Sequence, residues 1–201
     1  MTIGASTTVG SYLVPAVFGA FHLQHPELRL ELQIANTAAV HDLVRRQIVE
    51  LGLTEGLAPD DQDLASSVFS RDQMVAITAP DDPVLAQAPL TARQLAALPF
   101  ILRERGSGTR EVIEEAFAKK RLRLEPIMSL GSSEAVMHAV AARLGVAMVS
   151  SLAAERELAS GALVAIRISD LAIRRSLHLV ELRGGSRSPA AARFVDLLQR
   201  T

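Results

Sequence analysis

The heptapeptide ERGSGTR occupies residues 104–110. An apolar run over Leu98–Leu102 precedes it, and a helical pattern over Glu111–Ala118 follows it. A strand that leads through a glycine loop into a helix often binds an anion, because a helix N-terminus carries unpaired N–H groups and a partial positive charge. The heptapeptide therefore predicts a binding loop, and the question is whether the chain transforms its ligand or senses it.

The same order of strand, loop and helix recurs along the chain. Alternating hydrophobicity predicts a strand over Leu28–Ile34, and apolar residues three and four apart predict a helix over Ser11–Phe21. Further expected strands are Val49–Thr54, Leu64–Phe69, Gln73–Ala79, Phe100–Arg103, Ile127–Leu130, Val146–Val149, Ala162–Ile166 and Leu177–Leu182, and the last expected helix is Pro189–Leu198 after a Ser188 cap. This alternation is typical of an α/β fold with crossover connections.

Composition narrows the possible functions. The 201 residues are 49% hydrophobic, with a net charge of -1 and 3% aromatic residues, which argues against this chain alone binding nucleic acid or a membrane surface. It has no cysteine, so disulfides and thiolate chemistry are excluded. The first residues lack the basic segment and the following apolar segment of a signal peptide. No apolar run approaches the length of about 20 residues that a membrane-spanning helix needs. We therefore expect a cytoplasmic protein without a signal peptide or a membrane span.

Hydroxyl groups gather where the expected strands end. In α/β sheets, ligands bind at the carboxyl ends of strands. The residues there are Ser6-Thr7-Thr8, Asn36-Thr37, Thr54-Glu55, Ser107-Gly108-Thr109, Ser132-Ser133 and Ser150-Ser151. Each alone is more simply explained as a helix N-cap, with a weight of about three in four. Together they predict a site for a carboxylate, phosphate or sulfate that needs no metal, and Gly108 would allow a close backbone approach.

Sequence motifs for catalysis are missing. The loop lacks the Lys-Ser/Thr ending of a P-loop, no G-x-G-x-x-G follows a strand, and no G-x-S-x-G is present. The five histidines have no zinc-type spacing. Glu55 and Glu104 both end strands and are compatible with a general acid/base pair, with orienting a ligand's amine or hydroxyl, or with pairing to Arg103. We predict no catalytic residue, no metal site and no cofactor, so sensing is favoured over chemistry.

Several segments, in order, carry a family resemblance. They are Ile3-Gly4-Ala5-Ser6 with Thr8, Tyr12–Pro15, His25–Leu28, Leu51–Gly56, Glu104–Arg110, Gly131–Val136, Leu144–Ala147 and Leu158–Leu163. Together they cover essentially the whole chain, which resembles the effector-binding domain of a LysR-type transcriptional regulator. The segment Arg45–Glu50 departs from the family pattern, which usually has a Gly or Asp turn before the strand.

The resemblance implies a type II periplasmic-binding-protein-like fold with two Rossmann-like lobes. Lobe one would comprise residues 1–75 and 178–201, lobe two residues 76–177, and crossover strands near Met74–Ala79 and Arg175–Leu182 would join them. It also implies a winged helix-turn-helix domain before Met1 as the only DNA-binding part. A homodimer would form through the helices Ser11–Phe21 and Glu134–Ala142, and the full-length protein would be a tetramer.

By the same resemblance, a small and anionic effector would bind between the lobes and alter dimer or tetramer geometry to control promoter binding. The implied effector-binding residues are Ser6, Thr7, Thr8, Asn36 and Thr37 on lobe one and Arg103, Glu104, Ser107, Gly108, Thr109, Ser132 and Ser133 on lobe two. Two alternatives stay open at this point. One is a periplasmic solute-binding protein for an oxyanion, and the other is a lyase of similar fold.

Overall fold

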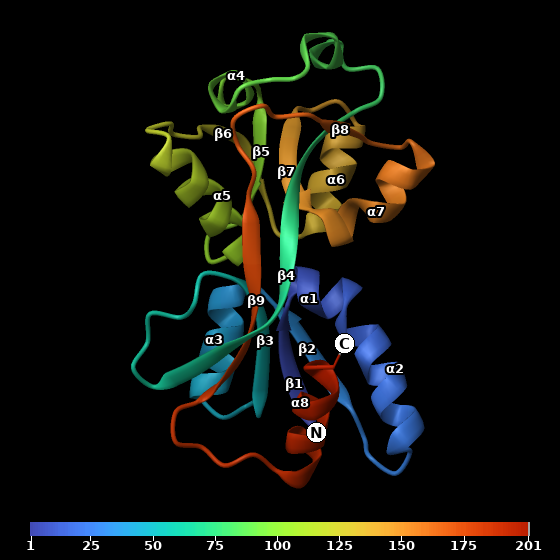
Figure 1. The fold of residues 1–201 in the computed structure, drawn as a ribbon, viewed down its shortest axis with the longest axis vertical. Helices are drawn as coiled ribbons and strands as arrows, with labels where there is room; N and C mark the ends of the chain where they lie inside the picture. Colours follow the sequence, from blue (N-terminus) through green and yellow to red (C-terminus); the bar gives the residue numbers. More distant parts are fainter. Residues whose placement is uncertain (201) are drawn as a thin grey trace. The chain divides into compact units, whose positions relative to one another are not determined.

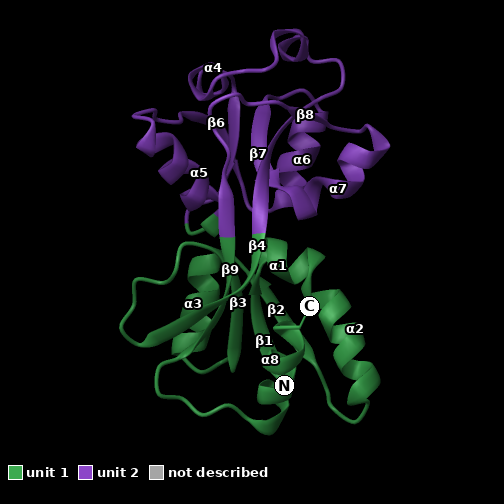
Figure 2. Cartoon of the chain, in the orientation of Figure 1, with its two compact units in different colours: residues 1–71, 106–108, 176–201 green, residues 72–105, 109–175 purple. Residues whose placement is uncertain are grey.

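The computed structural model describes residues 1–200, which fold into two compact units (Figures 1 and 2). Unit 1 comprises residues 1–71, 106–108 and 176–200, and unit 2 comprises residues 72–105 and 109–175. The chain changes unit within strand β4 (Leu64–Thr78), at both ends of residues 106–108, and within strand β9 (Arg174–Leu182). The sequence-based lobe ranges remain a prediction, and these units differ from them by a few residues at each change and by the placement of residues 106–108.

Unit 1 is built on the strand order β2-β1-β3-β9. Strand β1 pairs in parallel with β2 and β3, and β3 pairs antiparallel with β9. Its elements are β1 (Thr2–Ser6), α1 (Thr7–Tyr12), α2 (Val14–Gln24), β2 (Glu31–Ala35), α3 (Thr37–Arg45), β3 (Leu51–Gly56), β9 and α8 (Pro189–Leu198). Because β1, β2 and β3 run in the same direction, their carboxyl ends lie at one edge of this sheet.

Helix α3 packs closely on one face of the unit 1 sheet. A Cβ at Gly52 would lie 2.8 Å from a methyl of Val44, and one at Gly4 would lie 3.4 Å from a methyl of Val40, both on α3. Since a larger residue at either strand position would push these side chains away, the two glycines allow the close approach.

Helices α1, α2 and α8 contribute to the core on the other face. There, alternate strand residues such as Ile3, Leu53 and Leu179 form one buried cluster with helix residues, including Phe21 and Phe194. The Phe21 and Phe194 rings meet edge-on with centroids 5.5 Å apart. The residues of β3, and all but the first residue of β1, are accordingly buried on both faces of the sheet.

Unit 2 has the strand order β4-β7-β5-β6, with β8 beside β4. Strand β5 is parallel to β6 and β7, whereas β4 is antiparallel to β7 and β8. Its other elements are the 3-10 helix η1 (Pro83–Gln87), α4 (Ala92–Ala96), β5 (Phe100–Arg103), α5 (Gly108–Lys119), β6 (Pro126–Leu130), α6 (Ser133–Ala141), β7 (Val146–Ser150), α7 (Ser151–Ser160) and β8 (Val164–Ile166). Its own core includes Phe100 and Phe117, so each unit has a separate hydrophobic cluster.

The expected α/β class is confirmed, and two local predictions are wrong. The helix expected over Ser11–Phe21 is interrupted at Leu13, between α1 and α2, because Pro15 has no N–H to continue the helical hydrogen bonds. The two strands expected over Leu64–Phe69 and Gln73–Ala79 form the single strand β4. Asp72 does not end that strand, since its carboxylate is paired inside the protein.

Among residues 1–200, no helix combines the length and the apolar character that a bilayer crossing requires. Within the same residues, no three His, Cys, Asp or Glu side chains gather in a way that would hold a metal ion.

Candidate functional site

Ser6 and Glu55 meet at the carboxyl ends of β1 and β3 in unit 1. Both side chains are buried, and the Ser6 hydroxyl donates to the Glu55 carboxylate. The same hydroxyl oxygen accepts from the Glu55 backbone N–H at 3.2 Å. Although Ser6 is the N-cap of α1, its side chain makes no capping bond. The hydroxyl is therefore committed to Glu55, which the sequence-based site did not include.

Thr37 joins the heptapeptide to the same strand end. Its hydroxyl donates to the Glu55 carbonyl oxygen at 3.2 Å and accepts from the Gly108 N–H at 3.1 Å. A Cβ at Gly108 would lie 2.0 Å from that carbonyl oxygen and 2.8 Å from the Thr37 Oγ1. The Gly106 carbonyl also accepts from the Ala38 N–H at 3.1 Å. Residues 106–108 are thus fixed to unit 1, and Gly108 is required by this backbone contact.

Three of the expected strand-end side chains make ordinary caps. Asn36 accepts from Ala39 N–H at 3.0 Å at the start of α3, and Ser132 accepts from Ala135 N–H at 3.0 Å at the start of α6. Ser150 caps α7 in the same way. These bonds meet the needs of helix ends and do not by themselves indicate a ligand.

Two of the predicted site hydroxyls, both in unit 1, do not cap a helix. Thr8 and Ser107 are each 1% exposed. Within residues 1–200, neither Thr8 Oγ1 nor Ser107 Oγ has a hydrogen-bond partner. Leaving a buried hydroxyl unpaired costs about 1–3 kcal/mol, so native proteins usually provide it with a partner.

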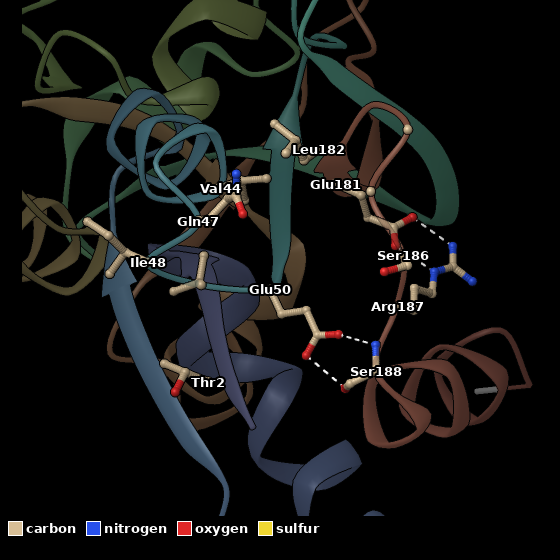
Figure 3. Close-up of a pocket in the computed structure, with 13 residues that line it drawn as sticks. Thr2, Val44, Gln47, Ile48, Glu50, Glu181, Leu182, Ser186, Arg187 and Ser188 are labelled. Atoms are coloured by element: carbon tan, nitrogen blue, oxygen red, sulfur yellow. Dashed lines mark hydrogen bonds and ion pairs between the residues drawn. The ribbon is translucent and has the colours of Figure 1, made fainter.

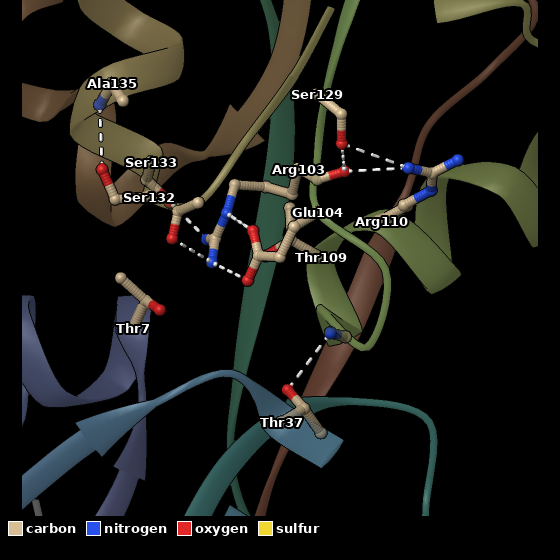
Figure 4. A network of polar contacts seen from close by, with 12 residues as sticks. Thr7, Thr37, Arg103, Glu104, Thr109, Arg110, Ser129, Ser132, Ser133 and Ala135 are labelled. Carbon is tan, nitrogen blue, oxygen red and sulfur yellow. Dashed lines mark hydrogen bonds and ion pairs between the residues drawn. The ribbon is translucent and has the colours of Figure 1, made fainter. Parts of the chain in front are cut away.

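Arg103 and Glu104 form a clamp at the end of β5 in unit 2 (Figure 4). The Glu104 carboxylate accepts from Arg103 Nε at 2.8 Å and from Nη2 at 2.9 Å. Arg103 also donates to the Ser133 hydroxyl at 3.2 Å and to the Gly131 carbonyl at 3.3 Å. This confirms that Glu104 pairs with Arg103, one of the three roles considered for it. The clamp joins the end of β5 to the start of α6 and balances the buried guanidinium charge.

Thr109 belongs to a second ionic cluster in unit 2. Its hydroxyl oxygen accepts from Arg175 Nη1 at 2.7 Å, and Arg175 pairs with Asp72 through two contacts of 2.7 Å. Neither Arg175 nor Asp72 was predicted as a site residue. They lie 103 residues apart and follow no local motif, so only the fold brings them together.

Two further side chains that the sequence did not single out are His41 of α3 and His178 of β9. Burial lowers the pKa of His178, an effect opposed by its hydrogen bond to the Gly56 backbone. Burial first, and then the positive charge of Arg45, lower the pKa of His41, while Asp61 acts in the opposite direction. Both imidazoles are therefore neutral at pH 7 in the folded chain.

This burial predicts a pH-dependent stability. Below the unfolded value of about 6.5, the unfolded chain binds more protons than the folded one, so stability is lost as pH falls from about 6.5 towards the lowered folded pKa. We expect the urea midpoint to drop between pH 7 and pH 5, and His178→Gln to reduce that drop. His22→Gln, at an exposed position, should leave it unchanged. An equal drop in His178→Gln and the parent would contradict this assignment.

The structure also contains a cavity of about 750 Å³ in unit 1 that includes none of the predicted site residues (Figure 3). It lies beside the loop after α3 and the loop before α8. At its wall, the Glu50 carboxylate accepts from the N–H and the hydroxyl of Ser188, and Arg187 pairs with Glu181. Arg187 and Glu181 on its wall therefore satisfy one another, and the Glu50 carboxylate is bound by Ser188.

Comparisons with known proteins agree with the resemblance seen in the sequence. A family model described as the LysR substrate binding domain matches residues 1–201. An uncharacterized HTH-type transcriptional regulator, YeiE of Escherichia coli K12, is 37% identical over 194 residues, which cover 96% of this chain and 66% of that protein. The RuBisCO operon transcriptional regulator of Allochromatium vinosum is 30% identical over 198 residues, which cover 98% of this chain and 65% of that protein. The chain thus spans slightly less than two thirds of these relatives.

Among solved structures, the regulatory domain of Synechocystis PCC6803 CcmR in complex with 2-PG is similar. Its TM-score is 0.90 at 25% identity, and the match covers 100% of this chain and 95% of that chain. The α/β fold of this chain is accordingly of the type II periplasmic-binding-protein-like kind.

Proposed function

The chain belongs to the family of LysR substrate-binding domains, and we propose that it senses a small anionic metabolite through the hydroxyl groups of the ERGSGTR loop and of α1. The family comprises transcriptional regulators and not enzymes. The similarity to regulators such as YeiE favours this reading over a solute-binding protein.

One observation carries the assignment of the site. Thr8 Oγ1 and Ser107 Oγ are buried, lie at positions predicted from the sequence, and have no hydrogen-bond partner within residues 1–200. A bound oxyanion would accept from both hydroxyls, and hydrogen bonds to charged groups contribute more than neutral ones. The cost of the unpaired hydroxyls in the free chain would then be recovered on binding.

The anionic class of the effector follows from what surrounds these hydroxyls. Helix N-termini follow Ser6 and Ser107, and they supply N–H groups and a partial positive charge. Arg103 is balanced by Glu104, so in this proposal the anion is held by dipoles and hydroxyls and by no free cation at that position. The CcmR regulatory domain, whose structure contains 2-PG, provides a precedent for a phosphate-bearing ligand on this fold.

The wider roles of the protein are part of the same proposal. The relatives are longer than this chain, and we place a DNA-binding helix-turn-helix domain outside it. When the effector binds, the arrangement of two lobes would change: lobe one (residues 1–75 and 178–201) and lobe two (residues 76–177). We propose that this takes place within a cytoplasmic homodimer or tetramer. For that change to occur, the effector must bind one arrangement more tightly than the other.

A pair of substitutions tests the site. A thermal-shift screen of small carboxylates, sulfate and sugar phosphates first identifies a ligand, because binding raises the apparent stability. Ser107→Ala and Thr8→Val each remove an unpaired buried hydroxyl, so the free chain should be as stable as the parent or more stable by about 1 kcal/mol. Calorimetry should show ligand affinity falling at least about fivefold, the equivalent of one lost hydrogen bond.

The control is Ser66→Ala, at an exposed hydroxyl on β4, which should change neither quantity. If Ser107→Ala and Thr8→Val instead destabilise the free chain and leave affinity unchanged, the hydroxyls are structural and this site assignment is wrong.

A further inference from the structure

The residues at which the chain changes unit are connected by one buried cluster. Asp72 is the first residue of unit 2, and Arg175 is its last residue. Thr109 is the residue at which the chain returns to unit 2 after residues 106–108 of unit 1. All three are buried, and the side chains of Asp72 and Arg175 have no exposed surface. The cluster therefore joins β4, β9 and the start of α5 within unit 2.

The Arg175 guanidinium is held in this cluster by two hydrogen bonds and one further ion-pair contact. Nε and Nη2 each contact Asp72 Oδ2 at 2.7 Å, and Nη1 donates to Thr109 Oγ1 at 2.7 Å. The other carboxylate oxygen of Asp72 accepts from the Gln73 N–H at 2.8 Å and from the Ser151 hydroxyl at 3.4 Å. Asp72 thus fixes the plane of the guanidinium, and the guanidinium in turn fixes Thr109.

Such an arrangement is an inefficient way to gain stability. Removing two charges from water costs several kcal/mol per ion, and buried ion pairs are often no more stabilising than apolar residues of the same size. The contact with Thr109 gives the pair a different use. A hydroxyl that accepts from a guanidinium has one lone pair committed, which orients its proton, and charged donors make shorter and stronger hydrogen bonds than neutral ones.

We infer that Arg175, held by Asp72, is a positioning residue for anion recognition: it orients the Thr109 hydroxyl and places a positive charge one hydrogen bond behind it. This inference rests on the proposed function, in which Thr109 contacts the anionic effector. Arg175 acts through Thr109 and does not touch the ligand. The ion pair keeps the charge in place inside the protein, while the ligand is held by a neutral hydroxyl.

The two members of the pair should then have opposite effects on affinity. Arg175→Gln leaves the Asp72 carboxylate uncompensated near the anion, and we expect affinity to fall at least tenfold. In Asp72→Asn the amide oxygen can still accept from the guanidinium, but the Arg175 charge is uncompensated, and we expect affinity to rise at least threefold. The double variant Asp72→Asn/Arg175→Gln has no charge in the cluster and should lie between them. A cluster that only stabilises the fold would lower affinity in all three variants.

The conservative variant Arg175→Lys provides a second test of the inference if Asp72→Asn does not fold. It keeps the charge and loses the planar fork. We expect its stability to fall as in Arg175→Gln, while its affinity stays within threefold of the parent. Arg143→Gln removes the exposed partner of Asp81 in the same unit and should leave affinity unchanged.

The experiment is calorimetric titration of the whole chain with 2-phosphoglycolate, inorganic phosphate and sulfate at fixed ionic strength, together with urea unfolding of each variant. Opposite signs for Arg175→Gln and Asp72→Asn, or retention of affinity in Arg175→Lys alone, support the inference. Binding by the parent with equal losses in Arg175→Gln and Arg175→Lys overturns the inference and leaves the proposed function standing. No binding by the parent of these three anions, or of any carboxylate or sugar phosphate in the thermal-shift screen, overturns the anionic proposal and this inference with it.

Discussion

Replacing Gly108 with alanine is expected to lower the free energy of unfolding by about 3 kcal/mol, the upper part of the range for an overpacked site. The added Cβ would lie 2.0 Å from the Glu55 carbonyl oxygen, and that neighbour is backbone and cannot rotate away. Any shift that relieves the clash also breaks the bond from Gly108 N–H to Thr37. Urea unfolding followed by circular dichroism measures the loss.

The matched control is Gly131→Ala, because a Cβ at Gly131 would meet no atom within 4 Å. Its stability should stay within about 0.5 kcal/mol of the parent. We also expect faster amide exchange at residues 106–108 in Gly108→Ala, since those residues lose their anchor on unit 1. If Gly108→Ala were as stable as Gly131→Ala, the close contact between Gly108 and Glu55 would be wrong.

Phe194→Ala is expected to destabilise the chain by about 4 kcal/mol, a typical cost for a buried phenylalanine. Phe194 is fully buried, and its ring meets Phe18 and Phe21 edge-on at centroid distances of 5.7 and 5.5 Å. The substitution would open a cavity between α8 and α2, which contact one another in the unit 1 core. Because domains of this kind are stable by about 5–15 kcal/mol, a large share of the total would be lost.

Leu23→Ala is the control for this substitution, since Leu23 is 85% exposed on α2. Its effect should be within about 0.5 kcal/mol. Guanidinium or urea unfolding, with both variants measured at the same pH, gives the comparison. Equal midpoints for Phe194→Ala and the parent would show that α8 does not complete this core.

Local patterns were sufficient to predict most of the elements. Strand Phe100–Arg103 and helix Pro189–Leu198 occur with the bounds expected from their apolar spacing. Ser188 caps that helix by accepting from the Ala191 N–H, as its position predicted. These features depend on neighbouring residues only, so periodicity and cap chemistry are enough to predict them.

The candidate site was less accessible to such reasoning, because its contacts join distant parts of the chain. The heptapeptide was recognised from its small residues, but Gly108 contacts Glu55 and Thr37, which no local pattern reveals. No sequence pattern indicated that Arg175 and Asp72 would pair, since each is an ordinary charged residue in a strand. The resemblance to a family supplied the list of site residues, and the structure adds which of their atoms are already committed and which are not.

The most direct measurement of the central claim is a titration of ¹⁵N-labelled chain with the anion selected by the thermal-shift screen, followed by amide chemical shifts. Our account predicts that the largest saturable changes occur at Thr8, Ser107 and Thr109, with smaller ones at Arg175. Saturable changes confined to Gln47–Glu50 and Gly184–Ser188 would place the ligand in the cavity of Figure 3 and would contradict the account.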